Sequence, residues 1–272
     1  MSEDKQRVFS GSLPEFYDRY IVPMNFAPYA RILADRAKVL APSRVLETAA
    51  GTGILTQNLV RTLPAGVAIT ATDLNQAMID LARAKSGMAD VTWRQADAMK
   101  LPFPDGSFDL IVCQFGVMFF PDKPAAFREA SRVLRLGGAF LFAVWDSYKT
   151  MNKSPLAIAA GVAGDMLGRE PLSLLSPPYH DEKAIRADLA AAGFGAVQVE
   201  RISQPCRAPS ARDAAVITVQ GTMIRAAIEA ADPVRLGEVT DAVERVMLAR
   251  FGSGPVEGEM NALIVTAEKP SA

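Results

Sequence analysis

The sequence has little cysteine, one histidine, no excess of charge and no long hydrophobic run. Two cysteines among 272 residues, Cys113 and Cys206, are too few for a disulfide framework or a thiolate metal site, so no metal is expected. The net charge of −1, with Lys and Arg spread along the chain, excludes a basic surface for nucleic acid. The apolar runs are shorter than the ~20 residues of a membrane span. The polar start MSEDKQR precedes no apolar signal segment, so a cytoplasmic location is expected.

From residue 44 onward, strand-like apolar runs alternate with helical periodicity, which is typical of a parallel sheet covered on both faces. The sequence predicts an α/β fold: a Rossmann-like, doubly wound sheet of seven strands, mostly parallel with an antiparallel C-terminal strand, plus helical additions covering the cleft. The first expected strand begins at about residue 44. The other six cover 67–73, 91–97, 108–115, 139–145, 197–203 and 261–269.

The helices between these strands are predicted from caps and apolar spacing. Residues 13–40 are helical with a break near Pro23, and Asp122 begins a helix that ends at Gly137-Gly138. A capping box at Ser210 and Asp213 opens a helix to about residue 231, and another runs from 232 to 252. We predict one domain, 1–272, with a helical cap at 1–43, a core at 44–146, an insertion at 147–180, and the rest of the sheet at 181–272, including the helix pair at about 210–252.

The stretch 45–53, VLETAAGTG, combines the end of a strand, a turn of small residues and the start of a helix. Apolar residues recur at every fourth position from Leu55 to Leu63, which predicts that helix. Without a Cβ, Gly51 and Gly53 let a ligand lie against the main chain. Backbone N–H groups at such a turn face a bound anion or polar ligand.

Three acids, Glu47, Asp73 and Asp97, each end a predicted strand. Because parallel strands end at one edge of a sheet, we expect these acids along one rim. Asp73 follows Gly53 by 20 residues, the interval at which an acid binds the ribose of a nucleotide held by such a turn. The alternative is that Asp73 only interacts with the N-terminus of the next helix.

A nicotinamide dinucleotide site also fits this interval. That site needs a third glycine where this chain has Thr56. Glu47, four residues before Gly51, would repel its pyrophosphate. A carboxylate at Glu47 suits a ligand whose reacting end is positively charged, such as a sulfonium or an ammonium group.

Four segments together resemble the class I S-adenosylmethionine-dependent methyltransferases, in the type 11 group that is similar to ubiquinone/menaquinone-biosynthesis enzymes. They are ETAAGTG, ATD, QADAMKLPFPDGSFDLIVCQFGVMFF and ASRVLRLGGAFLFAVW. The resemblance spans about 44–146 and departs from the family pattern at Ala49, where the family has a glycine, and at Leu136, where it has a proline. We expect the extra methyl group of Ala49 to cost little.

The resemblance implies S-adenosylmethionine as cofactor, S-adenosylhomocysteine as product, and residues 44–146 as the cofactor-binding core. The implied contacts are the methionine moiety at Glu47, Thr48, Ala49, Gly51 and Gly53; the ribose at Asp73; the adenine at Leu74, Asp97 and Ala98; and the methionine end at Gln114 and Phe115.

Methyl transfer from a sulfonium requires alignment and exclusion of water, and orientation alone can supply ~7–11 kcal/mol. No catalytic side chain is therefore assigned. A general base would help an acceptor that loses a proton, and the candidates are His180, Tyr17 and Tyr20. Alternatively, His180 begins a helix and the tyrosines pack the N-terminal helix on the core. Apolar side chains past the fourth and fifth strands form either an acceptor pocket or ordinary core: Phe115, Met118, Phe119 and Trp145, with Tyr20 as a further pocket residue.

These observations predict methyl transfer to a small or medium-sized, partly apolar acceptor. The insertion and the helix pair are placed to close over the cleft, which favours a small-molecule partner. Two alternatives stay open: a cofactor-binding sensor or non-catalytic partner subunit, and a nicotinamide-dependent oxidoreductase. The acceptor's identity, and whether the protein is a monomer or a homodimer, are left undecided.

Overall fold

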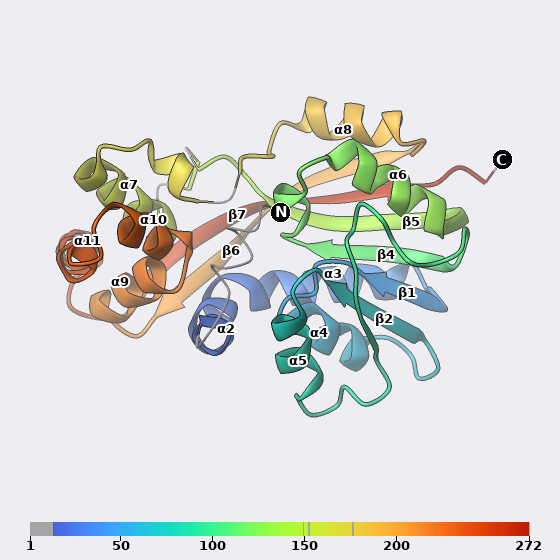
Figure 1. The fold of residues 1–272 in the computed structure, drawn as a ribbon, viewed down its shortest axis with the longest axis horizontal. Helices are drawn as coiled ribbons and strands as arrows, with labels where there is room; N and C mark the ends of the chain where they lie inside the picture. Colours follow the sequence, from blue (N-terminus) through green and yellow to red (C-terminus); the bar gives the residue numbers. More distant parts are fainter. Residues whose placement is uncertain (1–12, 149, 152, 176, 272) are drawn as a thin grey trace.

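The strands of the computed structural model, which describes residues 13–271 except 149, 152 and 176, form one sheet. Their order is β3-β2-β1-β4-β5-β7-β6 (Figure 1). The strands are β1 (Arg44–Glu47), β2 (Ala68–Asp73), β3 (Thr92–Gln95), β4 (Phe108–Gln114), β5 (Leu134–Trp145), β6 (Val197–Ala208) and β7 (Val256–Glu268).

Helices connect and cover these strands. They are α2 (Leu13–Phe16), η1 (Tyr17–Phe26), α3 (Ala27–Val39), α4 (Ile54–Thr62), α5 (Gln76–Arg83), η2 (Val117–Phe119), α6 (Lys123–Val133), α7 (Pro155–Leu167), η3 (Pro171–Leu174), α8 (Glu182–Ala191), α9 (Ala211–Gln220), α10 (Met223–Ala231) and α11 (Arg235–Phe251). Among these described helices, none is long and apolar enough to cross a membrane.

The pairing of the strands confirms the predicted fold class. β1 pairs in parallel with β2 and β4, β2 with β3, and β4 with β5, while β7 runs antiparallel to both β5 and β6. β4 and β5 are apolar and buried along most of their length, as central strands of a parallel sheet are.

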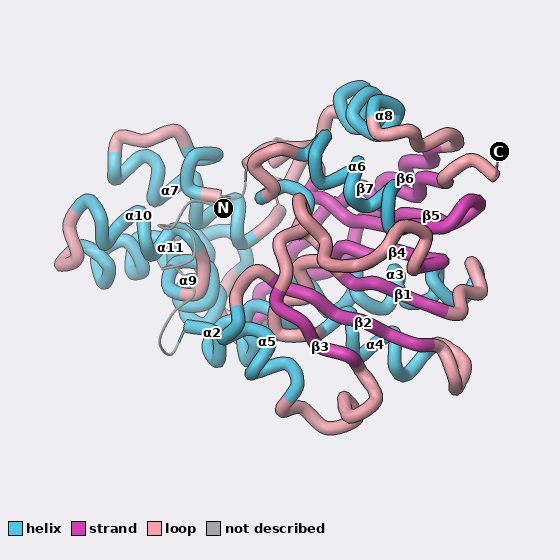
Figure 2. Tube along the Cα trace, turned by 45° about the vertical axis from the view of Figure 1, so that its right-hand side comes forward, coloured by secondary structure: helices cyan, strands magenta, loops and turns pink. Residues whose placement is uncertain are grey.

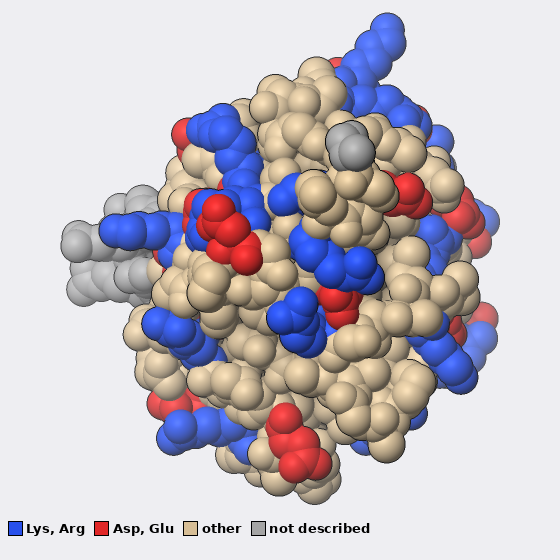
Figure 3. All heavy atoms as spheres, turned by 90° about the vertical axis from the view of Figure 1, so that its right-hand side faces the viewer, with Lys and Arg blue, Asp and Glu red and all other residues tan. Residues whose placement is uncertain are grey.

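Two layers of helices enclose the sheet, and a helical group lies at one end of it. Helices α3 and α4 pack together on one face, and α6 and α8 on the other (Figure 1). Helices α7, α9, α10 and α11 form the separate group beyond the sheet (Figures 1 and 2). On the face in Figure 3, basic and acidic side chains are interspersed, without a continuous basic surface.

The end of α6 corrects one prediction. The helix ends at Val133, not at Gly137-Gly138, and Leu134 already pairs with Phe108 at the start of β5. The glycines lie within the strand, where the register shifts, and a Cβ at Gly138 would be 2.8 Å from the carbonyl oxygen of Asp109. They therefore permit close strand packing and do not end a helix.

The predicted break near Pro23 is also wrong, because helical structure continues from α2 through η1 to α3. Proline lacks an N–H and its ring clashes with the preceding turn of an α-helix. Pro23 lies inside a π-helix that runs from Tyr17 to Phe26. The π-helix is a rare form that often occurs at functional sites.

The C-terminal elements differ most from prediction. The single helix expected from 210 to 231 divides at Gly221, and Thr222 caps α10 by accepting a bond from the N–H of Ile224 at 3.2 Å. β6 and β7 are longer than expected and pair without interruption from Val197 with Ala267 to Ala208 with Val256.

Candidate functional site

A cavity opens at the edge of the sheet where its parallel strands end. Its wall includes Gly51 after β1, Asp73 at the end of β2, Gln114 at the end of β4 and Trp145 at the end of β5. The cavity has a volume of about 230 Å³, whereas a cavity that holds one water needs only ~10–15 Å³ on the same measure. The cavity is therefore large enough for a ligand, at the edge where α/β sheets bind them.

The turn after β1 is held in a left-handed backbone conformation. Ala49 has φ +53°, Gly51 +55° and Gly53 +82°. A Cβ at Gly53 would lie 3.1 Å from the Cβ of Ala82, whereas one at Gly51 would meet nothing within 4 Å. The main chain at Gly51 therefore borders open space. The cost of alanine at position 49, expected to be small, lies in its backbone, because a left-handed non-glycine residue costs roughly 1–2 kcal/mol.

The Asp73 carboxylate joins this turn to the second strand and faces the cavity. It accepts hydrogen bonds at 2.8 Å from the N–H groups of Gly51 and Asn75. Burial raises the pKa of Asp73, while these backbone donors oppose the shift. Asn75 caps α5, so the bond expected at the start of the next helix is present. Asp73 therefore holds the turn in place and lies at the surface of the cavity.

The neighbouring wall follows β2 and β3. Leu74, Met78, Asp97 and Ala98 line the cavity there. The carboxylate of Asp97 accepts a hydrogen bond from the N–H of Met99 at 2.9 Å, which orients it. A carboxylate between apolar side chains suits a flat, partly apolar ring that carries an N–H donor.

Glu47 lies behind the turn and does not line the cavity. Thr48 and Gly53 do not line the cavity either. The Glu47 side chain is 2% exposed and accepts a hydrogen bond from the Thr56 hydroxyl at 2.6 Å. Burial raises the pKa of Glu47 from its ordinary value of 4.5 to about 8, with Thr56 opposing and Asp73 adding to the shift. Sequence reasoning missed Thr56 as a partner of Glu47, although its position on the first turn of α4 was a signal.

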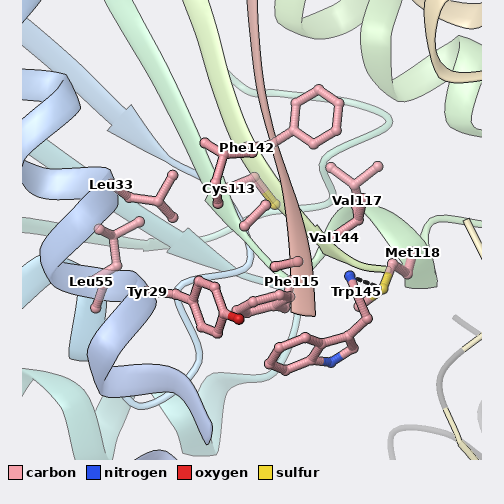
Figure 4. Packing of buried hydrophobic residues seen from close by; sticks show 14 of the residues in the cluster. Tyr29, Leu33, Leu55, Cys113, Phe115, Val117, Met118, Phe142, Val144 and Trp145 are labelled. Atoms are coloured by element: carbon pink, nitrogen blue, oxygen red, sulfur yellow. Dashed lines mark hydrogen bonds between the residues drawn. The ribbon is translucent and has the colours of Figure 1, made fainter. Parts of the chain in front are cut away.

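A second wall of the cavity is aromatic and is formed by Phe115 and Trp145, whose packing with Tyr29 behind them is seen in Figure 4. Phe115 and Trp145 stack with their ring centres 3.7 Å apart and 19° between planes, and Tyr29 meets Phe115 edge to face at 5.3 Å. Phe115 has φ +55°, a strained conformation for a bulky residue, of the kind that collects at functional sites. The backbone N–H of Trp145 contacts the Met118 sulfur at 3.4 Å. The expected acceptor-side residues Phe115, Met118, Phe119 and Trp145 all line the cavity.

The cover of the cavity comes from segments far apart in the sequence. Helix η1 contributes Tyr17, Asn25 and Phe26. The insertion contributes Leu156 and Leu175, and the junction of α9 and α10 contributes Gly221, Thr222 and Met223. The sequence predicted that the insertion and the helix pair at about 210–252 cover the cleft, but it did not assign Asn25 or the residues of the junction to the site; their only signals were a polar residue in the apolar run IVPMNF and a glycine inside a predicted helix.

Two of these covering segments, η1 and the α9–α10 junction, contact each other at Gly221. A Cβ there would lie 2.7 Å from the side chains of Ile21 and Phe16. Helix η1 is also tied to the glycine turn, because Lys85 pairs with Asp18 of η1 and donates to the carbonyl oxygen of Thr52 at 2.7 Å.

The candidates for a general base lie in different places. Tyr17 lines the cavity, and burial together with the Asp73 and Asp18 carboxylates raises its pKa, so its hydroxyl stays protonated at neutral pH. Tyr20 does not line the cavity, is 38% exposed and packs on Phe16. His180 also lies outside the lining and directly precedes Asp181, which caps α8. The structure thus favours the helix-start interpretation of His180, whereas Tyr17, and not the exposed Tyr20, packs η1 on the core.

The fold and the site define a class: a Rossmann-like sheet with the strand order and rim of acids of class I S-adenosylmethionine-dependent methyltransferases. A model described as a methyltransferase domain matches residues 46–142. The ubiquinone/menaquinone biosynthesis C-methyltransferase UbiE of Hahella chejuensis is 40% identical over 118 residues, 42% of this chain and 47% of that protein. A demethylmenaquinone methyltransferase of Thermus thermophilus is 31% identical over 178 residues, 61% of this chain and 80% of that protein.

Solved structures agree on the fold. The YcgJ protein of Bacillus subtilis has a TM-score of 0.58 and 19% identity, covering 90% of this chain and 100% of that one. The chain belongs to the class I S-adenosylmethionine-dependent methyltransferase family, in the ubiquinone/menaquinone-biosynthesis-like group. Its matches span a little under half the length of the first curated relatives.

Proposed function

We propose that this protein transfers a methyl group from S-adenosylmethionine to a small or medium-sized, partly apolar acceptor and releases S-adenosylhomocysteine. One observation carries the proposal. A single cavity has the glycine turn and two carboxylates, Asp73 and Asp97, on one side and the stacked rings of Phe115 and Trp145 on the other. One wall suits an adenosyl group and the other a flat apolar molecule.

The residues on the first wall fit the cofactor. The open space beside Gly51 admits a ligand against the main chain, Asp73 offers a carboxylate to ribose hydroxyls, and Asp97 offers one to the adenine amino group. When bound, S-adenosylmethionine supplies a methyl carbon on a positively charged sulfur, which is a good leaving group. Glu47 lies behind the turn with a pKa of about 8, so it is mostly protonated at neutral pH and adds a favourable negative charge only where a bound cation promotes its ionisation.

The chain contributes mainly alignment and the exclusion of water. The rings of Phe115 and Trp145 fix the plane of an aromatic acceptor, and η1 and the α9–α10 junction close the cavity above it. Holding acceptor and methyl carbon in line can supply ~7–11 kcal/mol of the barrier. Tyr17 stays protonated at neutral pH and acts as a hydrogen-bond donor and not as a base.

The names of the relatives support an apolar, quinone-like acceptor. They describe C-methylation in ubiquinone and menaquinone biosynthesis and methylation of demethylmenaquinone. The aromatic wall has the chemistry to stack on such a ring. The cytoplasmic location and the small-molecule partner expected from the sequence stay predictions.

Two measurements test the proposal. Isothermal calorimetry should show binding of S-adenosylhomocysteine and no binding of NAD. Incubation with methyl-labelled S-adenosylmethionine and a panel of phenols, naphthols and quinols should give a labelled organic product. Binding of NAD alone would overturn the proposal in favour of an oxidoreductase. Cofactor binding without any labelled product from the panel or a metabolite extract would favour the sensor alternative.

Limited proteolysis tests the role of the cover. We expect cleavage within 147–180 and 210–252 to slow when cofactor and acceptor are both present, because Leu156 and Met223 would then contact ligand. Unchanged cleavage in those segments would contradict a cover that closes.

A further inference from the structure

Asn25 carries a buried polar group that the fold does not use. It lies on η1, is 2% exposed and lines the cavity. Its Oδ1 atom has no hydrogen-bond partner among the residues that the structure describes. An unpaired buried acceptor of this kind is rare and costly, so it calls for an explanation.

A second amide lies beside it. Gln114, at the end of β4, donates from Nε2 to the carbonyl oxygen of Phe26 at 3.0 Å, which fixes it next to the residue that follows Asn25. Its Oε1 is buried and likewise lacks a partner among the described residues. Gln114 also lines the cavity. Two neighbouring amide side chains thus line one cavity, and the buried oxygen of each lacks a donor among the described residues.

The position of the pair indicates which ligand supplies the donor. The Phe26 ring, next to Asn25 in sequence, lies 5.4 Å from the ring centre of Phe115 and 5.7 Å from that of Trp145. Asn25 and Gln114 therefore both lie next to Phe26, whose ring packs on the aromatic wall. A molecule stacked on that wall has its edge within reach of η1.

We infer that Asn25 and Gln114 recognise the methyl acceptor through an O–H or N–H group, so the acceptor is a flat apolar ring that carries a hydrogen-bond donor. This inference rests on the proposed function. Amide oxygens only accept hydrogen bonds, so a ligand without a donor leaves both unpaired inside the closed cavity. Sites built in this way reject analogues that lack the donor. The pair positions the acceptor and takes no part in bond making.

Calorimetry with matched probes tests this, with S-adenosylhomocysteine at saturation. The probes are 1-naphthol, which has a hydroxyl donor, and 1-methoxynaphthalene, which has the same rings without one. We expect the wild type to bind 1-naphthol about tenfold more tightly. Asn25→Leu should abolish this preference, and Asn25→Asp, which keeps an oxygen at the same position, should retain it.

The controls separate binding from folding. Asn25→Leu removes an unpaired buried oxygen, so its Tm should be unchanged or higher, and Asn25→Ala replaces it if it does not fold. Asn58, whose Nδ2 donates to the carbonyl oxygen of Ile54 away from the cavity, provides the matched control Asn58→Leu, which should keep the preference. A wild type that does not favour 1-naphthol, or an Asn25→Leu protein that still does, would overturn the inference.

A second comparison distinguishes acceptor from cofactor. The affinity for S-adenosylhomocysteine should change less than twofold in Asn25→Leu. A loss of tenfold or more would assign the oxygen to the cofactor's ammonium group and overturn the inference. If the donor preference is present but labelled S-adenosylmethionine yields no product with any acceptor, methyl transfer fails as the function while the recognition site stands.

Discussion

The two walls of the cavity are built in different ways. The cofactor-side wall consists of backbone turns and acids between residues 49 and 98, close together in sequence and fixed by bonds such as that from the Gly51 N–H to Asp73. The acceptor-side wall and cover consist of side chains from η1, β4, β5, α7 and the α9–α10 junction, spread from residue 17 to residue 223. A local motif can encode the first wall, whereas the second exists only after distant segments pack together.

The largest effect is expected at Trp145 of the acceptor-side wall, which is 5% exposed and stacked on Phe115. A variant at this residue tests whether the two walls are independent. Trp145→Ala should lower the free energy of unfolding by about 3–5 kcal/mol, because it removes a large buried ring. Urea titration followed by circular dichroism measures this. Affinity for S-adenosylhomocysteine should stay within twofold in the folded protein, and Trp145→Phe should retain most of the stability. A tenfold loss of cofactor affinity would show that the walls are not independent.

On the cofactor side, Asp73→Ala should weaken binding of S-adenosylhomocysteine by about 1.5–3 kcal/mol, or roughly 10- to 150-fold. The variant loses the carboxylate that faces the cavity and the bonds that hold the turn. Calorimetry measures the change. Asp80→Ala, on the exposed side of α5, is the matched control and should bind normally. Unchanged affinity in a folded Asp73→Ala protein would remove this residue from the site.

Glu47, which lies behind the cofactor-side wall, makes the stability of the protein depend on pH. Its pKa in the folded protein, about 8, is above the ordinary 4.5, so the folded state holds a proton that the unfolded state releases. The resulting stability is full below pH ~4.5 and is lost as the pH rises through about 8. We expect the wild type to lose about 2 kcal/mol between pH 6 and pH 8 relative to Glu47→Gln, which keeps an acceptor for Thr56. Urea unfolding at each pH measures this. If the free energy of unfolding changes equally with pH in the two proteins, the pH dependence comes from groups other than Glu47.

The smallest expected change in stability tests the contact between the two walls at Gly116 and Ala49. A Cβ at Gly116 would lie 2.4 Å from the Cβ of Ala49 and 2.8 Å from the sulfur of Cys113. Gly116→Ala should cost about 1–3 kcal/mol of stability, and Ala49→Gly in the same protein should restore about 1 kcal/mol of it. A double-mutant cycle by urea unfolding measures this coupling, and strict additivity of the two changes would contradict the contact.

The same contrast explains what the sequence predicted. The core strands and the motif residues Gly51, Asp73, Asp97, Gln114 and Phe115 were placed at one edge, because strand ends and fixed spacings are local properties. The pattern did not predict the end of α6, since a Gly-Gly pair suits both a helix end and a tight strand. Tyr20 was assigned to the pocket because helical spacing alone does not say which face of η1 points inward. Asn25 and Thr222 were missed because their roles depend on the contact of η1 with α9.

The strand order also has a consequence for how the protein is made. β7 lies between β5 and β6, yet it is the last strand of the sheet to leave the ribosome. The strands from β1 to β5 can pair as soon as they emerge, since domains begin to fold from the N-terminus during synthesis. β6 pairs with β7 and with no other described strand, so in a nascent chain the sheet from β1 to β5 can form before the β6–β7 pair is added at its edge.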